Sequence, residues 1–150
     1  MENEKRNAEG YLDLTAYKAI KHIEKEALKT KNRRYRPLVY VCSPYAGNIA
    51  ENLKKARVYS RYICDIGCIP IAPHLLFTQF LDDSIKEERK LGMFYGNVIM
   101  GICRKVWVFG NTITSGMQSE IDRAKSKGFE LRYFDDNCKE VKKQIGGKNA

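Results

Sequence analysis

The sequence predicts one α/β domain built on a parallel sheet of four to five strands, with helices on both faces, and an additional N-terminal helix. Short apolar runs rich in Val, Ile, Tyr and Phe alternate with longer segments whose apolar residues recur at helical spacing. A repeated strand–helix order at this spacing requires parallel strands joined by crossover helices. The chain has 150 residues, 43% of them hydrophobic, which is enough for one domain with a core.

A helix is predicted near the N-terminus. Apolar residues recur near helical spacing from Leu14 to about Lys29, and Asp13 or Thr15 can cap the start of this helix. Its apolar stripe needs cover, and we expect it to pack against the domain or a partner subunit.

The boundaries of the domain follow from a linker and a tail. Thr30–Arg36 is a basic linker, and Pro37 closes it because proline pushes the preceding residue out of the helical region. We therefore expect the N-terminal helix and linker over residues 1–36, the domain over residues 37–136 and a polar tail over residues 137–150.

Four strands are predicted within the domain. Leu38–Cys42 is a continuous apolar run, typical of a strand covered on both faces. Cys68–Ala72 contains Pro70, which favours an edge strand or the first residues of a strand. The third and fourth strands are predicted at Lys105–Phe109 and Glu130–Phe134.

Three helices are predicted to connect these strands. They cover Asn48–Asp65, a segment from Ser84 toward Gly101, and Met117–Lys127. Asn48 and Ser84 are each followed three residues later by a glutamate, which is the pattern of a capping pair. The resulting order of elements indicates a flavodoxin-like or Rossmann-like sheet.

Charge and cysteine content limit the classes of partner and compartment. The formal net charge of +9 favours anionic partners, although the basic runs near both ends are typical of solvated segments, and nucleic acid is the less favoured partner. The five cysteines are scattered through mostly apolar segments, as expected of reduced thiols in a cytoplasmic protein. The close pair Cys64 and Cys68 has no neighbouring ligands, so neither a metal nor another cofactor is expected. No apolar run is long enough to span a membrane.

Chemistry is expected where the parallel strands end, because ligands of such folds bind at the carboxyl ends of the strands. Those ends are Ser43–Gly47, Ala72–Phe77 and Gly110–Gly116. The first loop leads into a helix at Asn48 and offers backbone N–H groups to an anion such as a phosphate, although an ordinary tight turn has the same composition.

Three acidic residues and one histidine are candidates for catalysis. Glu120 falls near the first turn of the third helix, where a carboxylate can act as nucleophile or general base, or can simply complement the helix dipole. Asp82 and Asp83 can supply an acid near a leaving group, or a helix cap. His74 can polarise a leaving base, or can be a packed residue at the edge of the core.

Taken together, these segments resemble the nucleoside 2-deoxyribosyltransferase-like superfamily, including its uncharacterised phage and bacterial members. The resemblance covers roughly Leu38–Phe134. It is carried by Val39–Tyr45, Ile71–His74, Phe80–Asp83 and Ser115–Ala124, and their order and spacing are more specific than any single segment.

The resemblance implies roles for particular residues. Glu120, which follows Gly116 in the pattern Gly-x-x-x-Glu, would attack the anomeric carbon, Tyr45 would orient it, and Asp82 or Asp83 would handle the base. Thr114 stands where transferases often carry an aspartate, which, with the positive charge, favours a 5′-phosphorylated substrate. The residues expected to contact the substrate are Ser43, Pro44, Gly47, Asn48, His74, Thr114, Ser115, Gly116 and Met117.

The predicted function is therefore an N-glycosidase or 2-deoxyribosyltransferase that cleaves the N-glycosidic bond of a nucleoside or 5′-nucleotide through a covalent glycosyl–Glu120 intermediate. The resemblance also implies a homodimer or larger homo-oligomer. The alternative is a non-catalytic module that binds a nucleotide or a nucleotide-derived signal in the same cleft.

Overall fold

The computed structural model of the chain describes residues 14–32 and 35–142. The chain divides into two units, Met1–Tyr35 and Arg36–Ala150, which are described separately. No helix in the described residues is long and apolar enough to cross a membrane.

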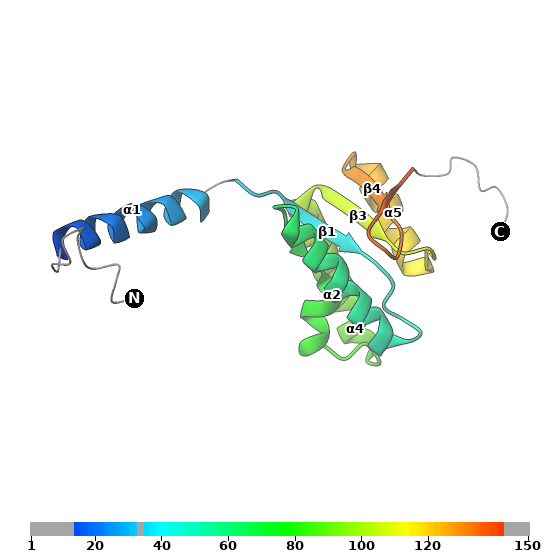
Figure 1. Cartoon of the computed structure of the whole chain (residues 1–150). Coiled ribbons are helices and arrows are strands. Elements are labelled where there is room, and N and C mark those ends of the chain that lie inside the picture. The colour runs from blue at the N-terminus through cyan, green and yellow to red at the C-terminus, as the bar shows by residue number, and fades with distance from the viewer. Residues whose placement is uncertain (1–13, 33–34, 143–150) are drawn as a thin grey trace. The chain divides into compact units, whose positions relative to one another are not determined.

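The first unit contains helix α1, Leu14–Asn32 (Figure 1). The helix runs past the expected end at Lys29, so the predicted linker is wrong in its first three residues, where the sequence contains neither Gly nor Pro. Thr15 lies inside the helix and cannot be its cap, while Asp13 lies outside the described residues. Most of the described side chains of α1 are exposed.

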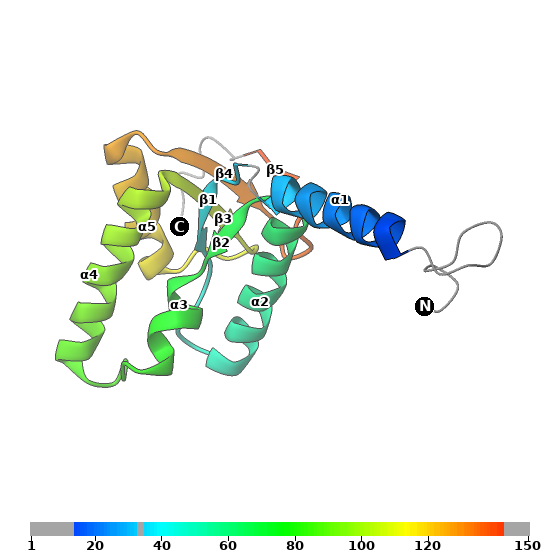
Figure 2. The same ribbon diagram turned by 90° about the vertical axis from the view of Figure 1, so that its left-hand side faces the viewer.

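The second unit is built on a five-stranded sheet in the order β2-β1-β3-β4-β5 (Figures 1 and 2). The strands β1, β2, β3 and β4 are parallel, and β5 is antiparallel to β4. Pro70 lies in β2 at the edge of the sheet, as the sequence predicted. The strands are β1 Leu38–Cys42, β2 Ile69–Ile71, β3 Lys105–Phe109, β4 Glu130–Phe134 and β5 Glu140–Val141.

Strand β5 corrects the prediction of a polar tail from residue 137. Its turn forms because Asp135 accepts hydrogen bonds from the backbone N–H groups of Asn137 and Lys139, while Cys138 adopts a positive φ of 60°. The Arg132 side chain donates two hydrogen bonds, of 2.9 and 2.6 Å, to the Glu140 carboxylate. The short polar strand β5 is therefore stabilised by contacts that the sequence pattern does not indicate.

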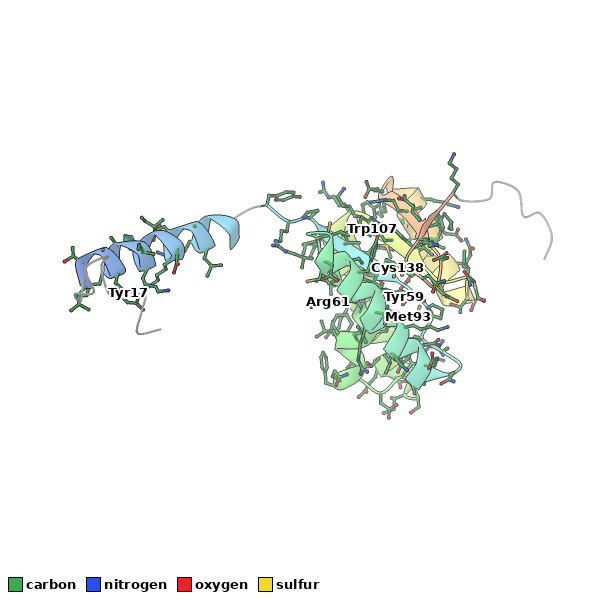
Figure 3. The ribbon with its side chains drawn as sticks, viewed as in Figure 1. Tyr17, Tyr59, Arg61, Met93, Trp107 and Cys138 are labelled. Carbon is green, nitrogen blue, oxygen red and sulfur yellow. The ribbon has the colours of Figure 1, made fainter. Side chains whose placement is uncertain are left out.

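Helices cover both faces of the sheet, as predicted. Figure 2 shows α2, Ile49–Asp65, on one side of the strands, and α4, Lys86–Cys103, and α5, Ser115–Lys127, on the other. Two apolar clusters lie between these layers. Tyr59 and Trp107, labelled in Figure 3, belong to the cluster under α2.

Helix starts differ from the predicted capping pairs. Asn48 caps α2 as expected, accepting from the backbone N–H of Glu51 at 3.2 Å. Ser84 does not cap α4, because its hydroxyl and backbone N–H both donate to Asp82, and α4 begins only at Lys86. The helix continues through Gly101 and ends before Arg104, which has a left-handed φ of 58°. A short helix, α3 Pro73–Leu76, and a 3-10 turn, η2 Phe77–Gln79, follow β2.

Candidate active site

The loops that follow the parallel strands meet at one edge of the sheet. The strand order reverses between β1 and β3, and this switch point is where open α/β sheets bind ligands. A Cβ built on Gly110, after β3, would lie 3.9 Å from Pro44 Cδ, after β1, so the two loops are in contact. Gly110 has a φ of +105°, which favours glycine.

Glu120 is held at this edge by a tyrosine of the first strand. Glu120 lies in α5, three residues after Met117 and one before Ile121, which are both buried against the sheet. The Glu120 side chain is therefore only partly exposed. The hydroxyl of Tyr40 in β1 donates a hydrogen bond of 2.7 Å to Glu120 Oε1. This bond joins α5 to the centre of the sheet and fixes the position of the carboxylate.

Burial dominates the electrostatics of this pair. Burial raises the pKa of Glu120, and hydrogen bonds from Cys42 and Tyr40 partly oppose that rise. Burial, followed by the charge of Glu120, raises the pKa of Tyr40 well above its ordinary value, and the same causes raise that of Cys42. Tyr40 and Cys42 therefore remain protonated, and both can donate to an ionised Glu120. The Cys42 thiol also lies 3.9 Å from the carbonyl oxygen of Met117.

The tyrosine that donates to Glu120 is thus Tyr40 rather than Tyr45. The sequence pattern shows Tyr40 only as part of an apolar run, and the signal that points to its role is that a fully buried tyrosine needs a partner for its hydroxyl. Its ring is only 2% exposed, so the hydroxyl has to bond within the protein. Tyr45 lies elsewhere, in a cavity beside the carboxylates of the loop before α4.

That cavity has a volume of about 790 Å³ and is lined by Tyr45 together with Asp82 and Asp83. The lining contains three carboxylates and no Lys or Arg among the described residues. Glu120 is not among the described residues that line it. The lining residues are Tyr45, Ile49, Thr78, Gln79, Phe80, Leu81, Asp82, Asp83, Ser84, Ile85 and Glu88.

The Asp82 carboxylate is held by Ser84, two residues later in the same loop. Hydrogen bonds from the hydroxyl and backbone N–H of Ser84 lower the pKa of Asp82, which is exposed and therefore ionised at neutral pH. The backbone N–H of Asp82 donates to Glu88, so that carboxylate is engaged in holding the loop. Asp83 approaches Arg89, with 3.9 Å between Oδ1 and Nε. An ionised Asp82 can accept a hydrogen bond from a ligand but cannot supply a proton.

His74 connects the cavity to the first loop. A hydrogen bond of 2.9 Å joins its Nε2 to the hydroxyl of buried Ser43, and its ring centroid lies 6.3 Å from that of Tyr45. Burial lowers the pKa of His74 from 6.5 to about 4, so the imidazole is neutral at physiological pH. Ser43 directly follows Cys42, and a continuous run of contacts therefore leads from Tyr45 to the surroundings of Glu120.

The remaining residues predicted to contact a substrate differ in burial and in the bonds they make. Thr114 caps α5, and its hydroxyl accepts from the backbone N–H of Met117 at 3.2 Å. Met117 is only 2% exposed and packs in the core, so its side chain faces away from solvent. Ser115 and Gly116 are exposed at the start of α5, and Gly47 and Asn48 are exposed at the start of α2.

Two polar residues that the sequence analysis did not select shape these loops. The Asn52 amide donates to the carbonyl oxygens of Tyr45 and Ala46, each at 3.0 Å, and so holds the first loop. Asp136, after β4, accepts from the Asn111 amide at 3.0 Å and from the Tyr59 hydroxyl at 3.3 Å, and so anchors the loop after β3. Within residues 14–32 and 35–142, no three His, Cys, Asp or Glu side chains gather as metal ligands would.

The second unit is thus an α/β domain with a mostly parallel sheet covered by helices on both faces, and its fold is similar to that of nucleoside deoxyribosyltransferases. A similar solved structure is the 2-deoxyribosyltransferase of the psychrotolerant bacterium Bacillus psychrosaccharolyticus, with a TM-score of 0.57 and 15% sequence identity over 70% of this chain and 77% of that one. At this identity the likeness concerns the fold. No curated protein matches the chain.

Residues 37–134 match the family described as Domain of unknown function (DUF7768), and the chain belongs to that family. The match covers the region from the residue before β1 to the end of β4, and so includes Tyr40, the cavity and Glu120.

Proposed function

We propose that the chain cleaves the N-glycosidic bond of a nucleoside or 5′-nucleotide, as an N-glycosidase or a 2-deoxyribosyltransferase, with Glu120 as the nucleophile. The observation that carries this proposal is the partly buried Glu120 carboxylate at the carboxyl edge of the sheet, held by Tyr40 at 2.7 Å. An oriented carboxylate of this kind is suited to attack an anomeric carbon. The nucleoside deoxyribosyltransferase-like fold supports a nucleoside-related role.

The proposed reaction has two displacement steps. A Glu120 oxygen forms a bond to C1′ of the sugar, the bond from C1′ to the base nitrogen breaks, and its electron pair leaves with the base, which takes up a proton from water. A water molecule or a second base then attacks C1′, and the electron pair of the ester bond returns to Glu120. The incoming water or base loses one proton to solvent. Tyr40 donates to Oε1 of Glu120, which is a carboxylate oxygen before the first step and after the second.

The cavity beside Tyr45 is suited to the base. Ionised Asp82 can accept a hydrogen bond from an exocyclic amine, and Phe80 and Ile85 offer apolar surface to a ring. The three lining carboxylates would repel a phosphate. These charges favour an unphosphorylated substrate, or a pose in which the 5′-phosphate expected from Thr114 and the net charge lies outside the cavity.

Base release tests this function directly. The purified chain would be incubated with a panel of nucleosides and 5′-nucleotides, and free base would be measured by chromatography. The expected result is release that Glu120→Gln abolishes and that Glu51→Gln, an exposed glutamate at the start of α2, leaves unchanged. Release at the same rate from Glu120→Gln would refute the mechanism.

A non-catalytic binding module is the second candidate, and a specific observation favours it. Glu120 is absent from the described lining of the cavity, so a ligand could fill the cavity without reaching the carboxylate. In that case a nucleoside or nucleotide would raise the melting temperature of the wild type and of Glu120→Gln equally, and no base would be released. Protection of the wild type together with base release would exclude this alternative.

We also propose that the chain forms a homo-oligomer. Five large apolar side chains of α4 are 40 to 64% exposed, and four of them recur at helical spacing along one side of the helix. A helix with apolar residues on its outer as well as its inner face is usually covered by another element. Light scattering after size-exclusion chromatography would give a single-chain mass if this proposal is wrong. The four exposed apolar residues that share this side of α4 are Leu91, Phe94, Val98 and Ile102.

The five unpaired cysteines support a reducing compartment such as the cytoplasm.

A further inference from the structure

Helix α4 contains three glycines, although glycine in a helix interior is less favourable than alanine. They are Gly92, Gly96 and Gly101, and none of them has a positive φ. The backbone conformation therefore does not require glycine at any of these positions. The remaining physical reason for a glycine is a neighbouring group that needs the space a side chain would fill.

Only Gly96 has such a neighbour. A Cβ built at Gly96, which is buried, would lie 3.3 Å from the hydroxyl oxygen of Tyr40 and 4.0 Å from Pro73 Cβ. At Gly92 the nearest atom is Leu81 Cδ1 at 3.6 Å, an ordinary contact, and at Gly101 there is nothing within 4 Å. A side chain would therefore be crowded at Gly96, would make an ordinary contact at Gly92 and would meet open space at Gly101.

The atom that Gly96 accommodates is the same one that holds the candidate nucleophile. Tyr40 Oη lies 2.7 Å from Glu120 Oε1, and the ring of Tyr40 is fixed in the middle of the sheet with 2% exposure. The hydroxyl is therefore confined between α4 and the carboxylate. A methyl group at position 96 would push it by a few tenths of an ångström.

We propose that Gly96 is a positioning residue for Glu120, because its missing side chain leaves the Tyr40 hydroxyl where it can hold the carboxylate. The importance of this position for turnover rests on the proposed function, whereas the effect on the carboxylate does not. The other titratable groups that interact with the pair are the thiols of Cys42 in β1 and Cys103 in α4. Burial raises the pKa of both thiols, to about 11 for Cys103, so neither brings a charge to the pair at neutral pH.

The consequence is a change in the ionisation of Glu120. A displaced hydroxyl donates a weaker hydrogen bond to the charged carboxylate, and the ionised form is then less favoured. We expect Gly96→Ala to move the titration of Glu120 to higher pH. If the chain releases base through Glu120, kcat at neutral pH should fall about tenfold, the loss expected for a weakened bond to a charged group, with KM little changed.

The test is a titration of Glu120 in the full-length chain, followed by the 13C shift of its side-chain carboxyl, whose signal is assigned by its loss in Glu120→Gln. Gly96→Ala should raise the titration midpoint, and Gly101→Ala, the matched control on the same helix, should leave it unchanged. In the Tyr40→Phe background Gly96→Ala should have no further effect, because the hydroxyl is gone. An unchanged midpoint in Gly96→Ala, or an equal shift with and without the Tyr40 hydroxyl, would overturn the proposal.

Folding provides a second measurement. If Gly96→Ala alone does not fold, the double variant with Tyr40→Phe should recover a cooperative thermal transition, and failure to recover it would also overturn the proposal. None of these measurements needs a substrate. Absence of base release with any nucleoside would therefore refute the proposed function without affecting the result for Gly96.

Discussion

The buried histidine should make the stability of this protein sensitive to acid. His74 is hydrogen-bonded to Ser43 at 2.9 Å, and burial lowers its pKa from 6.5 to about 4. The unfolded chain therefore takes up the proton more readily than the folded protein does. The stability that neutral His74 contributes is fully present above pH 6.5 and is lost as the pH falls through about 4.

The size of this effect follows from the two pKa values. Between pH 7.5 and pH 4.5 the linkage amounts to roughly 2–3 kcal/mol, most of it below pH 6. Such a loss is a large fraction of the stability of a small domain. Replacing His74 with Asn removes the titrating group while keeping a side chain that can bond to Ser43.

Urea unfolding at several pH values would measure this pH-dependent loss of stability. The single tryptophan, Trp107, is 3% exposed and reports unfolding by its fluorescence. From pH 7.5 to 4.5 the free energy of unfolding of the wild type should decline relative to that of His74→Asn by roughly 2–3 kcal/mol. His22→Asn, a change at an exposed histidine of α1, should follow the wild type. A difference between the wild type and His74→Asn that does not vary with pH would refute the reasoning.

Three further results are expected. Burial raises the pKa of Glu120, so ionisation opposes folding as the pH rises, and Glu120→Gln should increase the melting temperature by more at pH 8 than at pH 5; an equal increase at both would contradict this. Arg104→Gly should stabilise the chain to urea by roughly 0.5–1 kcal/mol, because Arg104 holds a left-handed φ of 58° at the end of α4, and a loss would show that its side chain matters more than its backbone. Gly110→Ala should destabilise it by about 1–3 kcal/mol, since the φ of +105° excludes a side chain and the new methyl group would lie 3.4 Å from Asp136 Oδ1; unchanged stability would count against a strained turn.

Much of the fold could be predicted from local patterns. Leu38–Cys42 and residues 106–109 are continuous apolar runs because both faces of these strands are covered. Pro70 lies on an edge strand because proline has no backbone N–H to donate within the sheet. Gly128 ends α5 with a φ of 70°, as the sequence indicated. These features depend on the conformational preferences of a few adjacent residues, so they are visible without the rest of the chain.

The candidate site was predictable only in part. The position of Glu120 near the start of α5 follows from helix periodicity. Tyr45, Asp82 and Asp83 line one cavity, but their role in a site shared with Glu120 stays a prediction. The sequence did not indicate that Tyr40 donates to Glu120. That contact joins residues 80 positions apart, and nothing near Tyr40 in the sequence shows which helix lies opposite it.

The sequence by itself therefore determined the alternation of strands and helices and the acidic and hydroxyl residues available at the strand ends, and it limited Pro70 to an edge strand or the first residues of a strand. Only the tertiary structure decided that Ser84 bonds to Asp82 instead of capping α4, that residues 140–141 join the sheet, that His74 is buried against Ser43, and that the described lining of the cavity excludes Glu120. The physical reason is that local propensity depends on neighbours along the chain. Burial, hydrogen-bond partners and the pKa of a carboxylate depend on whichever distant segments are packed beside it.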